Sequence, residues 1–312
     1  VEQAEDEIAA INMVLGASYT GVRGMTGTSG GGFSLMVEAL GLSGIAEIPI
    51  VIVNVQRPGP ATGLPTRTEQ GDLRFVIHAA QGEFPRKVIA VRHHEDAFVQ
   101  TIRAFKIAEK YQLPVIILSD QYLADGLATI KPFSLPERIL DSMPETNPGE
   151  YQRYALTDSG ISPRFKPGEP GRLVVTDSDE HDEGGLITES AEVRKNMVDK
   201  RMRKLQGILE ELEEPEYMGA EKAEVLLIGW GSTWGPIKEA VELLNRERPE
   251  TYCALVFGDV YPLPKKRLLE KAKQVKFLIN IEQNATGQLA GLIREETGIL
   301  CTQSILKYDG RQ

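Results

Sequence analysis

Hydrophobic and polar positions in the first half of the chain follow helical and strand patterns in alternation. From Ile8 to Leu15 the apolar side chains recur with helical spacing, which predicts a helix over Glu7–Tyr19. Ile48–Val55 is apolar and rich in β-branched residues on both faces, as is typical of a buried parallel strand. The same patterns predict helices over Phe33–Leu42 and Glu95–Tyr111 and strands over Val88–Val91 and Pro114–Asp120. This alternation favours an open, doubly wound α/β sheet.

Two glycine-rich segments interrupt this pattern, Gly24–Gly32 and Arg57–Gly63, and both are predicted to be loops. A helix that begins at Phe33 would point its N-terminus at the contents of the first loop, as in a phosphate cradle. The segment lacks the lysine of a Walker A loop and the G-x-G-x-x-G order. Taken alone, it is equally compatible with a tight turn.

The middle of the chain has a different character. Lys131–Gly185 holds many prolines and glycines and the acidic run Asp177–Glu183, which indicates a long surface connection. A charged helix is predicted over Thr188–Glu214, and a second α/β pattern starts near Ala223. Its predicted strands are Val225–Gly229, Tyr252–Phe257 and Val275–Ile281, and its predicted helices are Pro236–Asn245, Pro264–Gln274 and Gly287–Thr297. We therefore expect a first domain over residues 1–165, a linker with a charged helix over 166–219 and a second domain over 220–312.

Composition narrows the classes of function. With 312 residues and 41% hydrophobic content, the chain can bury the cores of two domains. It has 35 Lys plus Arg against 45 Asp plus Glu, so its net charge of 35 − 45 = −10 disfavours nucleic acid as a partner. Its longest apolar run is far short of the roughly 20 residues that a membrane span needs. The charged start after Val1 is not typical of a signal peptide. These features favour a cytoplasmic protein without a membrane partner.

The residues that most often bind metals are few and scattered. Cys253 and Cys301 fit a reducing compartment and cannot supply the four thiolates of an iron–sulfur cluster. None of the four histidines has metal-ligand spacing with another His or Cys, so no metal site is predicted. His181 lies in the acidic run, which would suit a cation but is more often a solvated loop. Glu282-Gln283-Asn284 ends a predicted strand and would either contact a partner or brace the domain.

Long motifs follow one another in order over essentially the whole chain. They are Gln3–Asn12, Gly16–Arg23, Met25–Gly30, Gln56–Leu73, Ser119–Asp125, Gly160–Arg164, Asp177–Glu183, Gly229–Thr233 and Glu282–Leu289. Together they resemble the alpha subunit of the 2-oxoacid:ferredoxin oxidoreductases, especially the 2-oxoglutarate type. The family usually has proline where Gly31 stands. It normally begins a few dozen residues earlier, with a Tyr-Pro-Ile-Thr-Pro segment that supplies a hydroxyl to the 2-oxoacid carboxylate. The resemblance therefore implies an N-terminally truncated first domain.

The resemblance implies a pyrimidine-binding (PYR) domain of thiamine enzymes followed by a transketolase C-terminal-like α/β domain. It implies oxidative decarboxylation of a 2-oxoacid, with 2-oxoglutarate favoured. Coenzyme A accepts the acyl group and ferredoxin the electrons, which gives acyl-CoA, carbon dioxide and reduced ferredoxin. Thiamine diphosphate would be shared with a beta subunit that holds Mg²⁺ and a [4Fe–4S] cluster. A gamma subunit or fused gamma domain is a further expected partner. This chain would be active only in that assembly.

The resemblance also assigns candidate residues. Glu7 matches the carboxylate that hydrogen-bonds the aminopyrimidine N1′ of the cofactor, with Glu5 as the substitute candidate. On its own, the run Glu5-Asp6-Glu7 reads more simply as acids that favour a helix start. Thr28, Ser29 and Gly30 are the other candidate cofactor-binding residues.

Arg57 matches the arginine that binds the 2-oxoacid carboxylate, although an exposed surface arginine is the simpler interpretation of the residue alone. Arg23 and Arg67 are weaker candidates of the same kind. An arginine fork suits a carboxylate because it donates two parallel hydrogen bonds. Two other functions stay open: a different thiamine enzyme of the transketolase or dehydrogenase type, and a non-catalytic assembly subunit.

Overall fold

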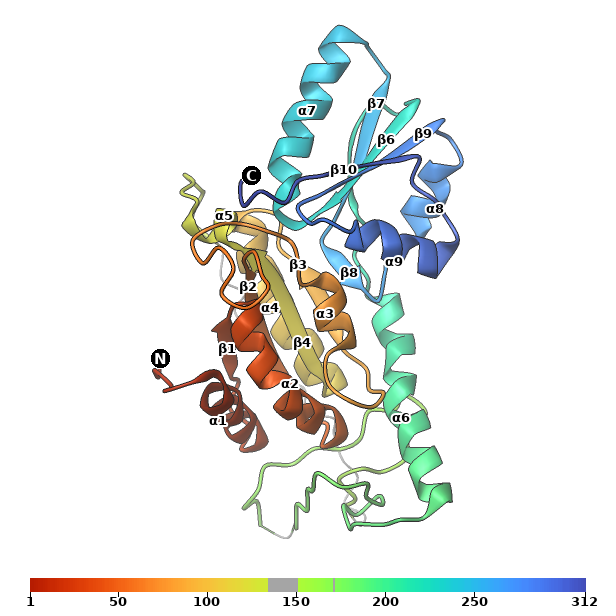
Figure 1. Ribbon diagram of the computed structural model, residues 1–312. Coiled ribbons are helices and arrows are strands. Elements are labelled where there is room, and N and C mark those ends of the chain that lie inside the picture. The colour runs from red at the N-terminus through yellow and green to blue at the C-terminus, as the bar shows by residue number, and fades with distance from the viewer. Residues whose placement is uncertain (134–150, 171) are drawn as a thin grey trace.

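The computed structural model describes residues 1–133, 151–170 and 172–312, which form two α/β units, each built on a five-stranded sheet (Figure 1). The first sheet has the strand order β1-β2-β4-β3-β8, and the second has the order β10-β9-β6-β7-β5. All strand pairs are parallel except β3–β8 and β5–β7, which place an antiparallel strand at one edge of each sheet. The α/β prediction is confirmed.

The first domain carries helices on both faces of its sheet. Ile50 and Ile52 of β2 pack toward α1, α2 and α3, whereas Val51 between them packs toward α4, because successive strand residues point to opposite faces. This is the doubly wound arrangement. The elements of this domain are α1 (Glu7–Tyr19), β1 (Met25–Thr28), α2 (Gly30–Ile45), β2 (Ile50–Gln56), α3 (Leu73–His78), β3 (Lys87–Ala90), α4 (His94–Tyr111), β4 (Pro114–Asp120) and α5 (Gln121–Asp125).

The glycine-rich segment is not the loop that its composition predicts. Met25–Thr28 forms the edge strand β1, and α2 begins at Gly30, three residues before the predicted start. The strand has no hydrophobic pattern of its own and exists because Met25 through Thr28 pair in register with Val51 through Asn54. Glycines occupy the first three positions of α2 because neighbouring segments approach the helix closely there. The short helices α3 and α5 were also not predicted.

The second domain shares its core with the first. One continuous apolar cluster joins the α1–α3 face of the first sheet to Phe257, Trp230 and the inner side chains of α8 and α9. The other face of the second sheet packs against α7. The elements are β5 (Glu216–Gly219), β6 (Val225–Trp230), η1 (Gly231–Thr233), α7 (Trp234–Glu247), β7 (Tyr252–Phe257), β8 (Asp259–Tyr261), α8 (Lys266–Ala272), β9 (Phe277–Glu282), α9 (Gln288–Thr297) and β10 (Gln303–Leu306). Since the core is continuous, the two domains pack as one body.

Strand β8 leaves the second domain and completes the first sheet. Its Asp259 is fully buried and lies 2.8 Å from Lys87 Nζ, while both terminal nitrogens of Arg103 donate to its carboxylate at 2.6 and 2.8 Å. Burial lowers the pKa of Lys87 to about 8, even though the negative charge of Asp259 by itself would raise that pKa. Because Lys87 lies on β3 and Arg103 on α4, these charges hold β8 in the first sheet. The short edge strands β5, β8 and β10 have no sequence pattern that predicts them.

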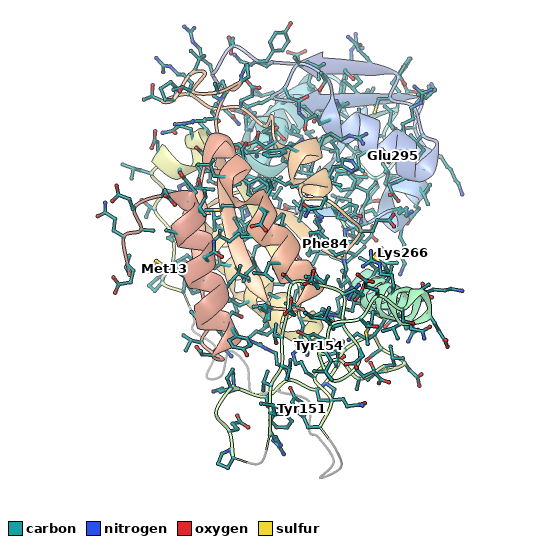
Figure 2. The ribbon with its side chains drawn as sticks, turned by 60° about the horizontal axis from the view of Figure 1, so that its bottom comes forward. Met13, Phe84, Tyr151, Tyr154, Lys266 and Glu295 are labelled. Atoms are coloured by element: carbon teal, nitrogen blue, oxygen red, sulfur yellow. The ribbon has the colours of Figure 1, made fainter. Side chains whose placement is uncertain are left out.

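The long connection between the domains is only partly a surface loop. Figure 2 shows its Tyr151 and Tyr154 at the opposite end of the molecule from Glu295 of the second domain. His181 is fully buried, its ring centroid 3.8 Å from that of Tyr154, and Glu180 pairs with Arg201 at 2.8 Å. The interpretation of this acidic run as a solvated loop is therefore wrong for these two residues. Part of the predicted connection lies outside the described residues.

The charged helix α6 (Ala191–Glu210) returns along the first domain and is anchored at its base by Glu47. Glu47 is fully buried in the turn after α2. Lys200 Nζ lies 2.6 Å from one of its oxygens, and Lys204 pairs with the other. Arg153 donates to the Glu47 carbonyl at 2.8 Å. The predicted helix over Thr188–Glu214 is confirmed in its core and shorter at both ends.

Within the described parts of the chain, none of the helices combines the length and the apolar character that crossing a bilayer would demand.

Candidate active site

The start of α1 separates the three acidic residues of the Glu5-Asp6-Glu7 run. Asp6 is the N-cap, and its carboxylate accepts from Ala9 N at 2.7 Å. Glu5 is exposed ahead of the helix. Glu7 is partly buried and turns toward the end of β1, where its Oε1 lies 3.5 Å from Thr28 Oγ1. Asp6 caps the helix, whereas Glu7, although it lies in the first turn, directs its carboxylate to Thr28.

The three glycines that open α2 each face a different element. A Cβ on Gly32 would overlap Thr28 Oγ1 and lie 2.5 Å from Glu7 Oε1. A Cβ on Gly30 would lie 2.5 Å from Asp72 Oδ2, and one on Gly31 would approach the carbonyl of Ala61. Close approach therefore requires glycine at 30 and 32, where a larger side chain would displace a carboxyl group.

The N-terminus of α2 presents polar groups at the carboxyl end of the first sheet. Ser29 is the N-cap and its side chain makes no capping hydrogen bond. The first N–H groups of a helix have no partner within the helix and favour a negative group nearby. Thr28, Ser29 and Gly30, predicted to contact the cofactor, thus share one corner with Glu7. Parallel α/β sheets bind ligands at this end of their strands.

Asp72 and Asn54 line the other side of this corner. Asn54 is fully buried on β2 and donates to Asp72 Oδ2 at 3.1 Å, while its own Oδ1 has no hydrogen-bond partner among the described residues. Burial raises the pKa of Asp72, an effect that the Asn54 hydrogen bond partly offsets. Burial also raises the pKa of Glu69, and the nearby charge of Asp72 adds to it. The Gln56–Leu73 motif includes Glu69 and Asp72 but not Asn54, and the family resemblance implies no role for any of the three.

Arg57 follows β2 directly, at the same end of the sheet. Its Nε is buried and has no hydrogen-bond partner within the described part of the chain. The weaker candidates differ: Arg23 pairs with Glu109 at 2.9 Å, and Arg67 is exposed and packs against Gly310. A buried guanidinium nitrogen without a partner suits an incoming carboxylate.

The remaining sequence candidates do not form a metal site. Across residues 1–133, 151–170 and 172–312, no group of three or more His, Cys, Asp or Glu side chains is placed to hold a metal ion. His93 caps α4 and contacts the Trp234 ring, and His94 bonds the carbonyl of Gly126 at 2.9 Å.

The Glu282-Gln283-Asn284 segment braces the second domain. The Glu282 carboxylate is buried and accepts from Trp230 Nε1 at 3.0 Å and from Asn284 Nδ2 at 2.7 Å. It also accepts from the backbone N–H of Leu289 at 2.9 Å, at the start of α9. A carboxylate at a helix N-terminus satisfies donors that would otherwise be unpaired. Of the two expected roles for this segment, these bonds favour bracing of the domain.

The described cavities lie away from the candidate corner. Four of them have volumes of about 240 to 410 Å³, and Glu7, Thr28 and Arg57 line none of these four. Beside the corner, α1 exposes the apolar side chains of Ile8 and Met13, and Figure 2 shows Met13 on the outer side of that helix.

Comparison with known proteins gives one family and a consistent set of relatives. The family described as pyruvate flavodoxin/ferredoxin oxidoreductase, thiamine diP-bdg, matches residues 1–200. A 2-oxoacid:ferredoxin oxidoreductase subunit alpha of Saccharolobus solfataricus is 42% identical over all of this chain and 50% of its own length. The 2-oxoglutarate synthase subunit KorA of Methanothermobacter thermautotrophicus is 30% identical over 99% of this chain and 82% of its own length. This chain spans about half the length of the first of these relatives.

Solved structures agree with this result. The 2-oxoglutarate:ferredoxin oxidoreductase from Magnetococcus marinus, with 2-oxoglutarate, coenzyme A and succinyl-CoA bound, matches with a TM-score of 0.92 and 39% identity. The match covers 99% of this chain and 54% of that chain. A split-gene transketolase matches with a TM-score of 0.50 at 12% identity, covering 96% of this chain and 71% of its own, which shows the shared fold alone.

Proposed function

The chain belongs to the family of 2-oxoacid:ferredoxin oxidoreductase alpha subunits, and on that premise we propose that it forms one half of a thiamine diphosphate site for oxidative decarboxylation of a 2-oxoacid. 2-Oxoglutarate is the favoured substrate because KorA relatives and the matching structure carry its name. The observation that carries the proposal is the meeting of Glu7, Thr28 and the glycine-rich start of α2 at one corner.

The residues of this corner fit the cofactor. Gly32 has no room for a Cβ because the Glu7 carboxylate and the Thr28 hydroxyl lie over it. Glycine at this position therefore leaves space for the Glu7 carboxylate at the corner where the cofactor would bind. Bound there, thiamine diphosphate supplies the carbon nucleophile for the 2-oxoacid carbonyl. Glu7 would share a proton with the pyrimidine nitrogen at its Oε atoms, and Arg57 would donate two hydrogen bonds to the substrate carboxylate.

The other half of the site would come from a partner. On α1, which begins at this corner, Ile8 and Met13 expose apolar surface that a partner could cover. We propose a beta subunit that holds the diphosphate through Mg²⁺ and carries a [4Fe–4S] cluster for transfer of electrons to ferredoxin. Coenzyme A would accept the acyl group, and a gamma subunit or fused gamma domain would complete the assembly. A cytoplasmic location remains a prediction.

Reconstitution tests the function. We expect no ferredoxin reduction by the 312-residue chain alone and restored reduction after co-expression with a cysteine-rich, thiamine-binding beta subunit. The assay would compare 2-oxoglutarate, pyruvate and a branched-chain 2-oxoacid in the presence of coenzyme A. Full activity of the isolated chain would refute the division of labour. Activity with pyruvate alone would refute the favoured substrate.

Replacing Arg57 by lysine is expected to raise the Michaelis constant for the 2-oxoacid by about 10- to 100-fold, with a smaller change in kcat. Lysine keeps the positive charge but loses the planar fork that binds a carboxylate at two points. The matched control is Arg67→Lys, since Arg67 is exposed on the same loop. Steady-state kinetics of the reconstituted complex measure both, and equal Michaelis constants for the two variants would contradict the role of Arg57.

A further inference from the structure

The loop that carries Arg57 is closed at its base by one side chain. Gln56, the last residue of β2, accepts from Asp72 N through its Oε1 at 3.0 Å and donates from its Nε2 to the Ser119 carbonyl at 3.2 Å. Arg57 is thus held next to a fixed point, while the far end of the loop returns at Asp72 to the same point. The two ends of the loop are therefore joined to each other at Gln56.

That far end is attached to the second domain through Gln70. Gln70 is fully buried, and its Nε2 donates to the Trp230 carbonyl at 2.7 Å. Its Oε1 accepts from Gln283 N at 3.2 Å, and its N donates to the Gln283 carbonyl at 2.7 Å. Its own carbonyl accepts from Asn284 Nδ2 at 3.2 Å. These four bonds cross the domain boundary, although Gln70 belongs to the loop of the first domain.

The next residues continue the same attachment. The Gly71 carbonyl accepts from Gln288 Nε2 at 2.7 Å, and Gln288 Oε1 accepts from Arg74 N at 2.9 Å. Gln288 is the first residue of α9. The backbone groups of Gln70, Gly71 and Arg74 therefore bond to the segment after β9 and to the start of α9, both in the second domain.

Asp72 brings this attachment to the cofactor corner. It is the N-cap of α3, yet its side chain makes no capping hydrogen bond there. The carboxyl group lies instead against Gly30 at the start of α2 and accepts from Asn54 Nδ2 at 3.1 Å. Gln70, Asp72 and Gly30 thus connect the second domain to the helix end that also faces Glu7.

We propose that Gln70 is a positioning residue through which the second domain sets 2-oxoacid binding, by holding the Arg57 loop against the N-terminus of α2. The inference rests on the proposed function and deepens it. The second domain contributes none of the candidate cofactor or substrate residues named above. Through Gln70 it would nevertheless influence the affinity for the substrate. Asp72 is the second anchor of the same loop.

The test uses the reconstituted complex with four variants of this chain: Gln70→Ala, Asp72→Asn, Glu216→Gln and Glu7→Gln. Glu216 is the matched control because it pairs with Arg92 at 3.1 Å across the same two domains, outside the loop. Each complex would be assayed with 2-oxoglutarate as the varied substrate, for the Michaelis constant and kcat, and for thermal unfolding. Asp72→Asn keeps the size of the side chain but replaces the carboxyl group that faces Gly30 and Asn54, so it serves as the test if Gln70→Ala fails to fold.

We expect Gln70→Ala to raise the Michaelis constant by about 10- to 100-fold with kcat changed by less than about threefold, because small misplacement of a substrate-holding group is costly. Asp72→Asn should raise the Michaelis constant in the same sense, and Glu216→Gln should leave it unchanged. The inference would be overturned if Gln70→Ala, Asp72→Asn and Glu216→Gln all had the same Michaelis constant, whether raised or unchanged. Unchanged turnover of both Glu7→Gln and Glu5→Gln would instead refute the proposed function itself, so the two failures are distinguishable.

Discussion

Replacing Glu7 by glutamine is expected to lower kcat of the reconstituted complex by about 10²- to 10⁴-fold, the usual contribution of a positioned acid–base group. The amide has nearly the same shape as the carboxyl group, so the packing over Gly32 is preserved. It cannot share a proton with a ring nitrogen, which is the role proposed for Glu7. The measurement is the rate of ferredoxin reduction at saturating 2-oxoacid, coenzyme A and thiamine diphosphate.

The run of acidic residues offers its own control for this result. Glu5→Gln changes the same chemical group two residues earlier, where the side chain is exposed and precedes the helix. It should retain turnover close to the unsubstituted protein. If Glu7→Gln also kept full turnover, the chain would be a non-catalytic assembly subunit. If Glu5→Gln lost turnover and Glu7→Gln did not, Glu5 would be the cofactor carboxylate.

Replacing Glu47 by glutamine is expected to lower the free energy of unfolding by about 3 to 5 kcal/mol, since it leaves buried ammonium groups without a counter-charge. Lys200 and Lys204 are both almost wholly inaccessible and pair with this one carboxylate. Burial alone would raise the pKa of Glu47, but Lys204, Lys200 and Arg153 outweigh it and hold that pKa far below its ordinary value of 4.5. Urea unfolding followed by circular dichroism measures the difference.

The effect has a defined pH dependence. Glu47 has a lowered folded pKa, so its stabilisation is fully present above pH 4.5 and is lost as the pH falls below that value. Burial lowers the pKa of Lys204 to about 8 even with Glu47 present, against an ordinary value of 10.5. In Glu47→Gln the lysines would release their protons more readily in the folded state than in the unfolded one. The variant should therefore gain stability as pH rises toward about 10, and its deficit should shrink.

A surface ion pair gives the contrast. Glu224 and Lys276 lie 2.6 Å apart, but both side chains are more than half exposed. Glu224→Gln should change stability by less than about 1 kcal/mol, because solvent screens the pair and the lost attraction is small. A loss of several kcal/mol in this variant, or less than about 1 kcal/mol in Glu47→Gln, would contradict the assignment of stability to the buried cluster.

Sequence patterns predicted the candidate site only in part. Motif resemblance brought forward Glu7, Thr28, Ser29, Gly30 and Arg57, and the structure places the first four at one corner and Arg57 at the same end of the sheet. Their roles stay predictions, to be decided by the variants above. Asp72 and Asn54 were missed because an aspartate after glycine and an asparagine within a strand have no distinguishing spacing. The close approach of Asp72 to Gly30, and the hydrogen bond from Asn54 to Asp72, place them at this corner.

The sequence by itself determined the alternating helices and buried strands, since α1, β4 and β7 have the bounds that their hydrophobic periods predict. It also determined the family, because long motifs survive in order. Tertiary structure alone decided the rest. The edge strands β1 and β8 exist through pairing with neighbours, and Gln70 joins the domains through partners about 160 and 214 residues away. Local patterns have no information about such distant contacts, because the energy of each depends on burial that only the folded chain creates.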